Sequence, residues 1–441
     1  MKGLPLAPSN FACLIITPFR GLAALVVLLL LALPAQAEDV TFKVLTSGAS
    51  AKFGGYMPQR LTLSTERPPG LKKLPDGLST PLFGTLSIGP KESPTRVIVI
   101  LDEPDNQPAR LFVDSNGDGD LSDVELAEWK ARPAKGRDGA EFKQYSGGAT
   151  LKVKYSDGLN ELHLAMYRFD KNDPQRKALK DVLLYYRDYA TTGDLLLGGK
   201  RYPAMLGDDL ASGDFRGHSD GKTSGIKLLV DLNGDGKFDR RAETFDSHKP
   251  FTVSGTTYEL AEMSPSGTSF KVIKSSQTVP EIAPLPNLSV GQKVVVFEAK
   301  TTDGTPIKFP SGYTGKLVLL DFWATWCGPC IAELPNLTKA YNDFHAKGLE
   351  VLGVSLDREN AAEKLADFTK QKNMPWPQIY DGKFWKSAIA ELYGVDSIPR
   401  AFLVDGTTGR ILATEGSLRG ANLSKTIERA LAGKQPLEAS E

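Results

Sequence analysis

The stretch DFWATWCGPCIAELP, residues 321–335, decides the fold of the C-terminal part of this 441-residue chain. It holds two of the three cysteines, Cys327 and Cys330, with a glycine and a proline between them. Two cysteines at this spacing reach disulfide geometry only where the backbone bends, as at a helix start. Pro329 suits the first helical position because no amide donor is needed there. The stretch therefore predicts a helix that begins at the cysteine pair.

The predicted helix gives the two cysteines different chemistry. Its N-terminus carries partial positive charge that stabilises a thiolate, so we expect Cys327 to be an exposed, readily ionised nucleophile. Cys330 lies one turn further on, faces inward, and would resolve the mixed disulfide. Asp321 ends an apolar run, and a buried carboxylate there could take the proton from Cys330. The alternative for Asp321 is a strand-end aspartate exposed to water.

A zinc half-site is the alternative role of the cysteine pair. Structural zinc needs four ligands, commonly from two such pairs or from added histidines. The sequence has no second C-x-x-C, and its four histidines have no ligand spacing to one another. The pattern therefore favours redox chemistry over zinc binding.

The motif FWATWCGPC resembles the thioredoxin active site almost residue for residue, and CIAELP resembles the C-x-x-E-x-P extension of the TlpA/ResA-like subgroup. The resemblance covers about residues 284–436. It implies a thioredoxin fold with a redox-active disulfide, in which Cys327 attacks and Cys330 resolves, and it matches Asp321 to the buried acid of the family.

The segment VDSIPR, residues 395–400, matches the family loop that faces the disulfide. The resemblance implies that Pro399 is cis and that the backbone of Ile398 pairs with the substrate. The catalytic residues that it implies are Cys327, Cys330, Asp321 and Pro399, and the substrate-binding residues are Trp326, Gly328, Pro329, Ile398 and Pro399.

The sequence also departs from the family pattern. Arg400 replaces the threonine that usually follows the proline, and Gly353 stands where thioredoxin has a lysine near the buried acid. KVVVF, residues 293–297, replaces the usual start of the domain. A peroxiredoxin is a weaker match, because that class has a threonine three residues before its cysteine and this chain has Ala324.

The pattern around the motif predicts an α/β layer fold, because strands alternate with helices and a hairpin follows. The expected strands are 316–320, 349–357 and 376–381, the hairpin is 400–414, and the helices are 329–348, 359–373, 384–395 and 422–433.

The chain before the motif contains two similar segments. LFVDSNGDGDLSDVE begins at residue 111 and LLVDLNGDGKFDRRAE at residue 228, and alternating apolar and polar residues around them predict antiparallel strands. We therefore expect two β-rich modules, 39–155 and 156–278, that arose by duplication. The alternative is one larger β sandwich with two similar loops. A proline-rich linker is expected at 279–292.

The two similar loops fit the calcium-loop spacing D-x-[DN]-x-[DN]-G-x5-E, the second without the final glutamate. A strand precedes the first loop, so this loop is not a helix–loop–helix EF-hand, and any Ca²⁺ would be structural. The alternative is a pair of acidic turns stabilised by Asx hydrogen bonds. The expected metal ligands are Asp114, Asn116, Asp118, Asp120 and Glu125 in the first loop, and Asp231, Asn233 and Asp235 in the second.

The first 37 residues read as a secretory signal peptide. Lys2 and Arg20 precede the apolar run 21–33, and Ala35-Gln36-Ala37 supplies small residues for cleavage after Ala37. A membrane anchor is the alternative, but the run is shorter than the ~20 residues that span a bilayer. Cleavage would remove Cys13 and leave Cys327 and Cys330 as the only cysteines.

Composition excludes some partners. Lysine plus arginine and aspartate plus glutamate both total 53, and no basic stripe or polybasic run indicates nucleic acid or lipid binding. Together with the length of the chain, the patterns above predict a multidomain protein with an N-terminal β-rich region and a C-terminal α/β thioredoxin fold.

The expected function is that of an exported, periplasmic or extracytoplasmic thiol-disulfide oxidoreductase that serves cell redox homeostasis. It would reduce the disulfides of client proteins, take electrons from a membrane or periplasmic thiol donor, and need no cofactor for the redox chemistry. The alternative is a calcium-stabilised binding or scaffold protein, whose thioredoxin-like domain recognises a client or a metal without turnover.

Overall fold

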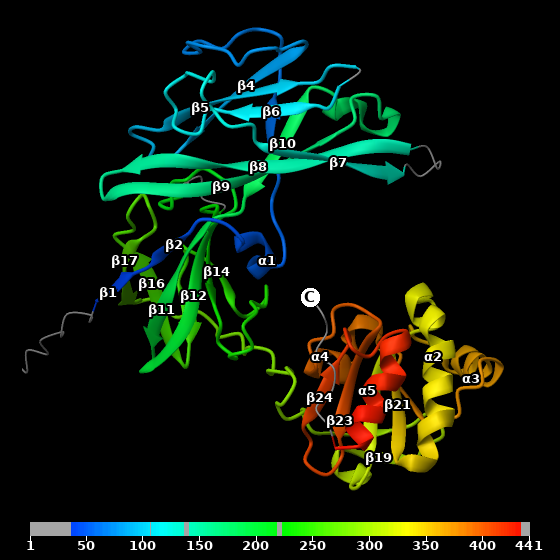
Figure 1. Ribbon diagram of the computed structural model, residues 1–441. Coiled ribbons are helices and arrows are strands. Elements are labelled where there is room, and N and C mark those ends of the chain that lie inside the picture. Colours follow the sequence, from blue (N-terminus) through cyan, green and yellow to red (C-terminus); the bar gives the residue numbers. More distant parts are fainter. Residues whose placement is uncertain (1–36, 106, 136–140, 218–222, 434–441) are drawn as a thin grey trace, which may run out of the picture. The chain divides into compact units, whose positions relative to one another are not determined.

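The computed structural model describes residues 37–105, 107–135, 141–217 and 223–433 (Figure 1). The predicted signal peptide lies outside these residues, apart from Ala37. The described part belongs to the compact unit that begins at Ala37. None of its helices is both long enough and apolar enough to cross a bilayer.

The C-terminal region has a five-stranded sheet in the order β22-β21-β20-β23-β24. The strands β20, β21 and β22 are parallel, and β23 and β24 are antiparallel to their neighbours, as in a thioredoxin fold. The bounds are β20 Leu317–Trp323, β21 Leu349–Ser355, β22 Gln378–Tyr380, β23 Arg400–Asp405 and β24 Ile411–Thr414.

Helices pack on this sheet, and α5 lies beside α2 (Figure 1). The α/β layer fold is thus present. A small hairpin, β18 Phe297–Lys300 with β19 Pro306–Phe309, precedes the sheet. The helices are α2 Gly328–Phe344, α3 Ala362–Gln371, α4 Ala388–Leu392 and α5 Ala421–Leu431, with 3-10 turns η2 Ser311–Tyr313, η3 His345–Lys347 and η4 Phe384–Lys386.

Two details of this region differ from the expected pattern. The helix expected at 384–395 is a 3-10 turn and a short helix, because Phe384 has φ 57° and Asp381 accepts hydrogen bonds from the amides of Lys383 and Ala388. Strand β20 also continues past Asp321 to Trp323, so Asp321 does not end the strand. It pairs with Gly353 on one side and Ala401 on the other.

The N-terminal region is built from antiparallel strands, as predicted. Over its described residues the sheets are β1-β17-β16-β15, β3-β10-β9-β8-β7, β14-β13-β12-β11-β2 and β4-β5-β6. Their bounds are β1 Glu38–Thr41, β2 Lys43–Leu45, β3 Gln59–Thr62, β4 Pro81–Ile88, β5 Thr95–Asp102, β6 Arg110–Val113, β7 Glu128–Lys135, β8 Glu141–Tyr155, β9 Gly158–Phe169, β10 Val182–Arg187, β11 Ala190–Leu197, β12 Lys200–Asp208, β13 Ile226–Val230, β14 Thr244–Asp246, β15 Phe251–Val253, β16 Thr256–Ala261 and β17 Ser269–Lys274; helix α1 is Ala49–Phe53 and the 3-10 turn η1 is Pro174–Leu179.

The two similar segments have the same local topology. Strands β4, β5 and β6 form a consecutive antiparallel set that leads into the first acidic loop, and β11, β12 and β13 form a matching set before the second. This match is what a duplication would produce, and the duplication itself stays a prediction.

The boundary expected between residues 155 and 156 falls inside a hairpin. Strand β8 pairs with β9 from Gln144 opposite Phe169 to Tyr155 opposite Gly158. A single hydrophobic cluster also includes Leu151, Leu164 and Leu228, which come from both expected modules. Strand pairing and core therefore favour the alternative of one larger β structure with two similar loops.

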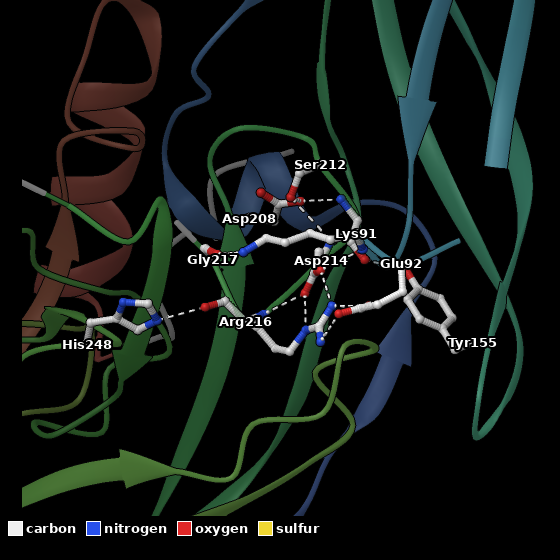
Figure 2. Close-up of polar contacts among 10 residues, drawn as sticks. Lys91, Glu92, Tyr155, Asp208, Ser212, Asp214, Arg216, Gly217 and His248 are labelled. Atoms are coloured by element: carbon white, nitrogen blue, oxygen red, sulfur yellow. Dashed lines mark hydrogen bonds and ion pairs between the residues drawn. The ribbon is translucent and has the colours of Figure 1, made fainter. Parts of the chain in front are cut away.

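A polar network ties the two segments together (Figure 2). Asp214 accepts hydrogen bonds from the backbone amide of Lys91 at 3.0 Å and from the Arg216 guanidinium at 2.6 Å. The same guanidinium bonds to Glu92 at 2.7 Å, and the Tyr155 hydroxyl donates to the carbonyl of Gly213. Since Asp214 is buried, its own hydrogen bonds are shielded from water, and they fix the β4–β5 turn against the loop after β12.

Candidate active site

The cysteine pair lies at the start of α2, where the sequence predicted it. Cys327 is the N-cap of the helix, Pro329 is in its first turn, and the two cysteines form a disulfide with a Cα–Cα distance of 5.2 Å. The Cys327 sulfur accepts a hydrogen bond from the amide of Cys330 at 3.2 Å. This amide is one of the free N–H groups of the helix N-terminus, which favour negative charge on the sulfur of Cys327 once the disulfide opens.

The expected exposure of Cys327 is wrong for this disulfide state. Both Cys327 and Cys330 are 4% exposed. The residues between them, Gly328 and Pro329, are exposed, and Trp326 is 43% exposed. A client therefore meets the exposed rim of the site before it reaches the sulfur of Cys327.

Asp321 and Cys330 line the same small cavity beneath α2. The cavity has a volume of about 20 Å³, and Pro399, Glu333 and Arg419 are also among its lining residues. A space of 10–15 Å³ or more holds one water molecule when polar groups surround it. The geometry therefore allows a proton to pass between Cys330 and Asp321 through one water.

The surroundings of Asp321 disfavour its charged form. Burial against apolar side chains raises its pKa to about 7, the positive charge of Arg419 acts to lower it, and the negative charge of Glu333 acts to raise it. A carboxyl group that titrates near neutral pH can both accept and release a proton there. The alternative of a water-exposed strand end does not fit this position.

Glu333, the glutamate of the C-x-x-E-x-P motif, is held in place beside the cavity. Its carboxylate accepts hydrogen bonds from the amide of Gly420 at 2.8 Å and from the Asn336 side chain at 3.1 Å. These bonds connect α2 to the start of α5, and they fix a negative charge near Asp321.

The loop that ends at Pro399 forms another wall of the site. The Ile398–Pro399 peptide bond is cis, the conformation that the family resemblance implies. Ile398 and Pro399 are both partly exposed, and Pro399 lines the cavity with Cys330. The side chain of Arg400, the next residue, forms an ion pair with Glu415 at 2.8 Å and is not among the residues that line the cavity.

The segment before Cys327 is anchored by a buried carboxylate. Asp357, which is 2% exposed, accepts hydrogen bonds from the amide of Thr325 at 3.0 Å and from its hydroxyl at 2.6 Å. A further bond comes from the Ser355 hydroxyl at 2.8 Å. This network fixes the approach to the cysteine pair from the end of β21.

The acidic loops of the N-terminal region have matching hydrogen bonds. Asp114 accepts bonds from the amides of Gly117 and Gly119, and Asp231 accepts bonds from the amides of Gly234 and Gly236, all at 2.7–3.0 Å. These bonds are those of Asx-type turns, and calcium binding by the loops stays a prediction.

The other expected metal ligands differ in their contacts and in their exposure to solvent. Asp118 and Asp120 accept bonds within the first loop and Asp120 pairs with Lys73, whereas Asn116 and Glu125 are exposed. In the second loop the Asn233 side chain accepts a bond from the amide of Asp235, and the Asp235 carboxylate accepts one from the amide of Lys237. In the part of the chain that the structure describes, no group of three or more His, Cys, Asp or Glu residues is arranged to hold a metal ion.

A buried glutamate, Glu243, holds the second loop. It stands one residue after the position of the missing final ligand, and it is 1% exposed. Its carboxylate accepts three amide hydrogen bonds, from Leu232, Asn233 and Asp239. The side chain therefore folds back onto the loop and is held there by these backbone amides.

Sequence reasoning missed three groups near the site. Arg419 and Asp357 lie far from the motif in sequence, and no pattern connects either of them to it. The aromatic pair Phe384 and Trp385 lies beside Trp326, with ring centroids 5.3 Å and 6.0 Å away. Gly353 indicated that the lysine usual beside the buried acid is absent, but nothing in the sequence identified Arg419 as the cation in its place.

Comparison with known proteins agrees with this geometry. The AhpC/TSA family model matches residues 290–411. The chain is 28% identical over 144 residues to the thiol-disulfide oxidoreductase ResA of Bacillus thuringiensis subsp. konkukian, which covers 33% of this chain and 78% of the relative. It is 29% identical over 119 residues to ResA of Bacillus subtilis, which covers 27% of this chain and 63% of the relative.

A solved structure matches the same region. The thioredoxin domain of a thiol-disulfide oxidoreductase from Bacteroides vulgatus is 33% identical, with 33% of this chain and 99% of that chain covered, and the TM-score is 0.29. The disulfide at the start of α2, the order of the sheet and the sequence relatives agree. The C-terminal region of this chain is therefore a thioredoxin-like protein-disulfide oxidoreductase domain that is similar to ResA and matches the AhpC/TSA family model.

Proposed function

We propose that the chain is an exported thiol-disulfide oxidoreductase that reduces disulfides in client proteins outside the cytoplasm. The observation that carries the proposal is the cavity that Cys330 shares with Asp321, directly behind a disulfide at a helix N-terminus. This arrangement supplies a nucleophile, a resolving thiol and a proton acceptor in one place.

The reaction begins with the dithiol form. The thiolate of Cys327 attacks one sulfur of the client disulfide, a mixed disulfide forms, and the other client sulfur leaves as a thiolate. The thiolate of Cys330 then attacks the Cys327 sulfur, which releases the second client thiolate. The client gains two electrons and two protons, and the protein ends in the disulfide form seen in this structure.

Asp321 would accept the proton that Cys330 loses in the second step. Cys330 is 4% exposed, so bulk water has little access to its sulfur. A carboxyl group with a pKa of about 7 is partly ionised at neutral pH and can take this proton. The exposed rim formed by Trp326, Gly328 and Pro329, together with Ile398, would contact the client during both steps.

Export and the electron source rest on the sequence. The predicted signal peptide supports a location outside the cytoplasm, and each turnover leaves a disulfide that an external thiol donor must reduce. The glycine and proline between the cysteines and the isoleucine before Pro399 favour the reducing direction.

The test is the reduction of insulin disulfides by the protein from Glu38 onward, with dithiothreitol as the electron donor. Cys327→Ser should abolish the rate above background, and Asp343→Asn, which removes an exposed carboxylate on α2, should leave it unchanged. A wild-type rate equal to background, in a protein whose disulfide is shown to open, would refute the proposal.

A further inference from the structure

Arg419 contacts two parts of the site, the Pro399 loop and the cavity behind the cysteine pair. It lies in the segment between β24 and α5, and its guanidinium Nη2 donates a hydrogen bond to the carbonyl of Pro399. Its side chain also lines the cavity that contains Asp321 and Cys330. One side chain therefore contacts the loop that faces the client and borders the expected proton acceptor.

The charges around Asp321 are few. Of the residues that line the cavity, Asp321, Cys330, Glu333 and Arg419 can carry charge, and only Arg419 is positive. The neighbours of Asp321 on the adjacent strands, Gly353 and Ala401, carry no charged side chain. The carboxylate of Glu333 is held beside the cavity by Gly420, the residue after Arg419.

Strand β21 has no room for a cation at this point. A Cβ atom on Gly353 would collide with the side-chain oxygen of Gln378. That oxygen is fixed because it accepts a hydrogen bond from the Trp323 indole at 2.9 Å, inside the domain core. The positive charge near Asp321 must therefore come from another element, and the segment before α5 supplies it.

We propose that Arg419 is a positioning residue that holds the Pro399 loop and keeps Asp321 ionisable for the resolving step. This proposal rests on the proposed function and deepens it. The positive charge favours the carboxylate form of Asp321 and offsets the effect of Glu333. The hydrogen bond to Pro399 fixes the loop independently of that charge.

Three substitutions separate the two roles. Arg419→Gln keeps a hydrogen-bond donor and removes the charge, Arg419→Lys keeps both in a different shape, and Arg419→Met removes both. Arg410→Met is the matched control, because Arg410 is an exposed arginine that donates to the carbonyl of Gly291 at 2.6 Å and is not among the residues that line the cavity.

The first readout is the titration of Asp321 by carbon NMR of protein labelled at aspartate carboxyl groups. The protein is kept in the disulfide form, and the signal is assigned by its loss in Asp321→Asn. An opposite charge beside a carboxyl group lowers its pKa by about 1–3 units. Arg419→Gln and Arg419→Met should therefore raise the midpoint by about one pH unit or more, whereas Arg419→Lys and Arg410→Met should stay close to wild type.

The second readout is client reduction against pH. The rising limb of the resolving rate should move to higher pH in Arg419→Gln and Arg419→Met, by the shift that NMR measures. The KM for insulin should rise most in Arg419→Met, which loses the bond to Pro399, and less in Arg419→Gln.

The outcomes are distinct. The proposal is overturned if Asp321 titrates in Arg419→Gln as it does in wild type, or if Arg419→Lys shifts it as far as Arg419→Gln does. Wild-type protein that reduces no insulin would refute the proposed function and not the effect of Arg419 on Asp321, because the NMR titration needs no turnover.

Discussion

Ionised Asp321 should make the folded protein less stable above neutral pH. Burial raises the pKa of Asp321 from the usual 3.8 to about 7 in the folded state. Between these values the folded protein holds one more proton than the unfolded chain, so raising the pH favours unfolding. Above pH 7 both states have lost this proton, and the difference stays constant.

The size of the effect follows from the pKa difference of about three units, since each unit corresponds to about 1.4 kcal/mol. This gives about 4 kcal/mol, and solvent screening of a partly exposed side chain lowers it to about 2–4 kcal/mol. Asp321→Asn has the shape of the protonated acid and no charge. We therefore expect the variant to match wild type at pH 4 and to be more stable by about 2–4 kcal/mol at pH 8.

The assay is guanidinium unfolding of the disulfide form at pH 4, 5, 6, 7 and 8, followed by tryptophan fluorescence. Trp323, Trp326, Trp376 and Trp385 lie in the C-terminal domain, so the signal reports mainly on it. Asp343→Asn is the control, because its exposed ion pair with Lys339 is worth little. A stability difference between Asp321→Asn and wild type that is the same at pH 4 and pH 8 would refute the reasoning.

Three other predictions concern separate parts of the chain. Asp321→Asn should slow the resolving step by up to ~10²-fold and leave the first attack intact, measured as each half-reaction by stopped flow; an unchanged rate contradicts this. If the acidic loops bind calcium, EDTA and Asp118→Ala should both lower the Tm of the N-terminal region, and Asp123→Ala should not. A Tm that EDTA leaves unchanged would show that the loops are ordinary turns. Asp214→Ala should destabilise the N-terminal region by about 2–3 kcal/mol in urea unfolding, because the Arg216 guanidinium and the Lys91 amide lose their partner; Glu92→Gln, at an exposed site, should cost less than about 1 kcal/mol.

The parts of the fold that the sequence predicted correctly depend on local patterns. The bend at Gly328 and Pro329, the apolar face of α2 and the strand–helix alternation each lie within a short stretch, and the structure has them where expected. The long pairing of β8 with β9, and the hydrophobic cluster that crosses the expected module boundary, depend on contacts between distant residues. No local pattern contains that information.

The candidate site divides in the same way. The motif identified Cys327, Cys330, Asp321 and Pro399 and implied their roles. Arg419 reaches the cavity only because β23 pairs beside β20 and β24 pairs beside β23. Glu243 accepts the amide bonds of its loop only because its side chain turns inward. The burial of Cys327 could not be predicted either, because it depends on how the closed disulfide packs at the helix start.

The most direct test of the central claim is to trap the mixed disulfide. Cys330→Ala cannot resolve, so incubation of its reduced form with an oxidised client peptide should give a stable adduct, and mass spectrometry of the digest should place the peptide on Cys327. Cys327→Ala should give none, because Cys330 lines the inner cavity with Asp321, whereas Cys327 is not among the residues that line it. An adduct on Cys330 in Cys327→Ala, or no adduct on Cys327 in Cys330→Ala, would contradict the assignment of attacking and resolving cysteines.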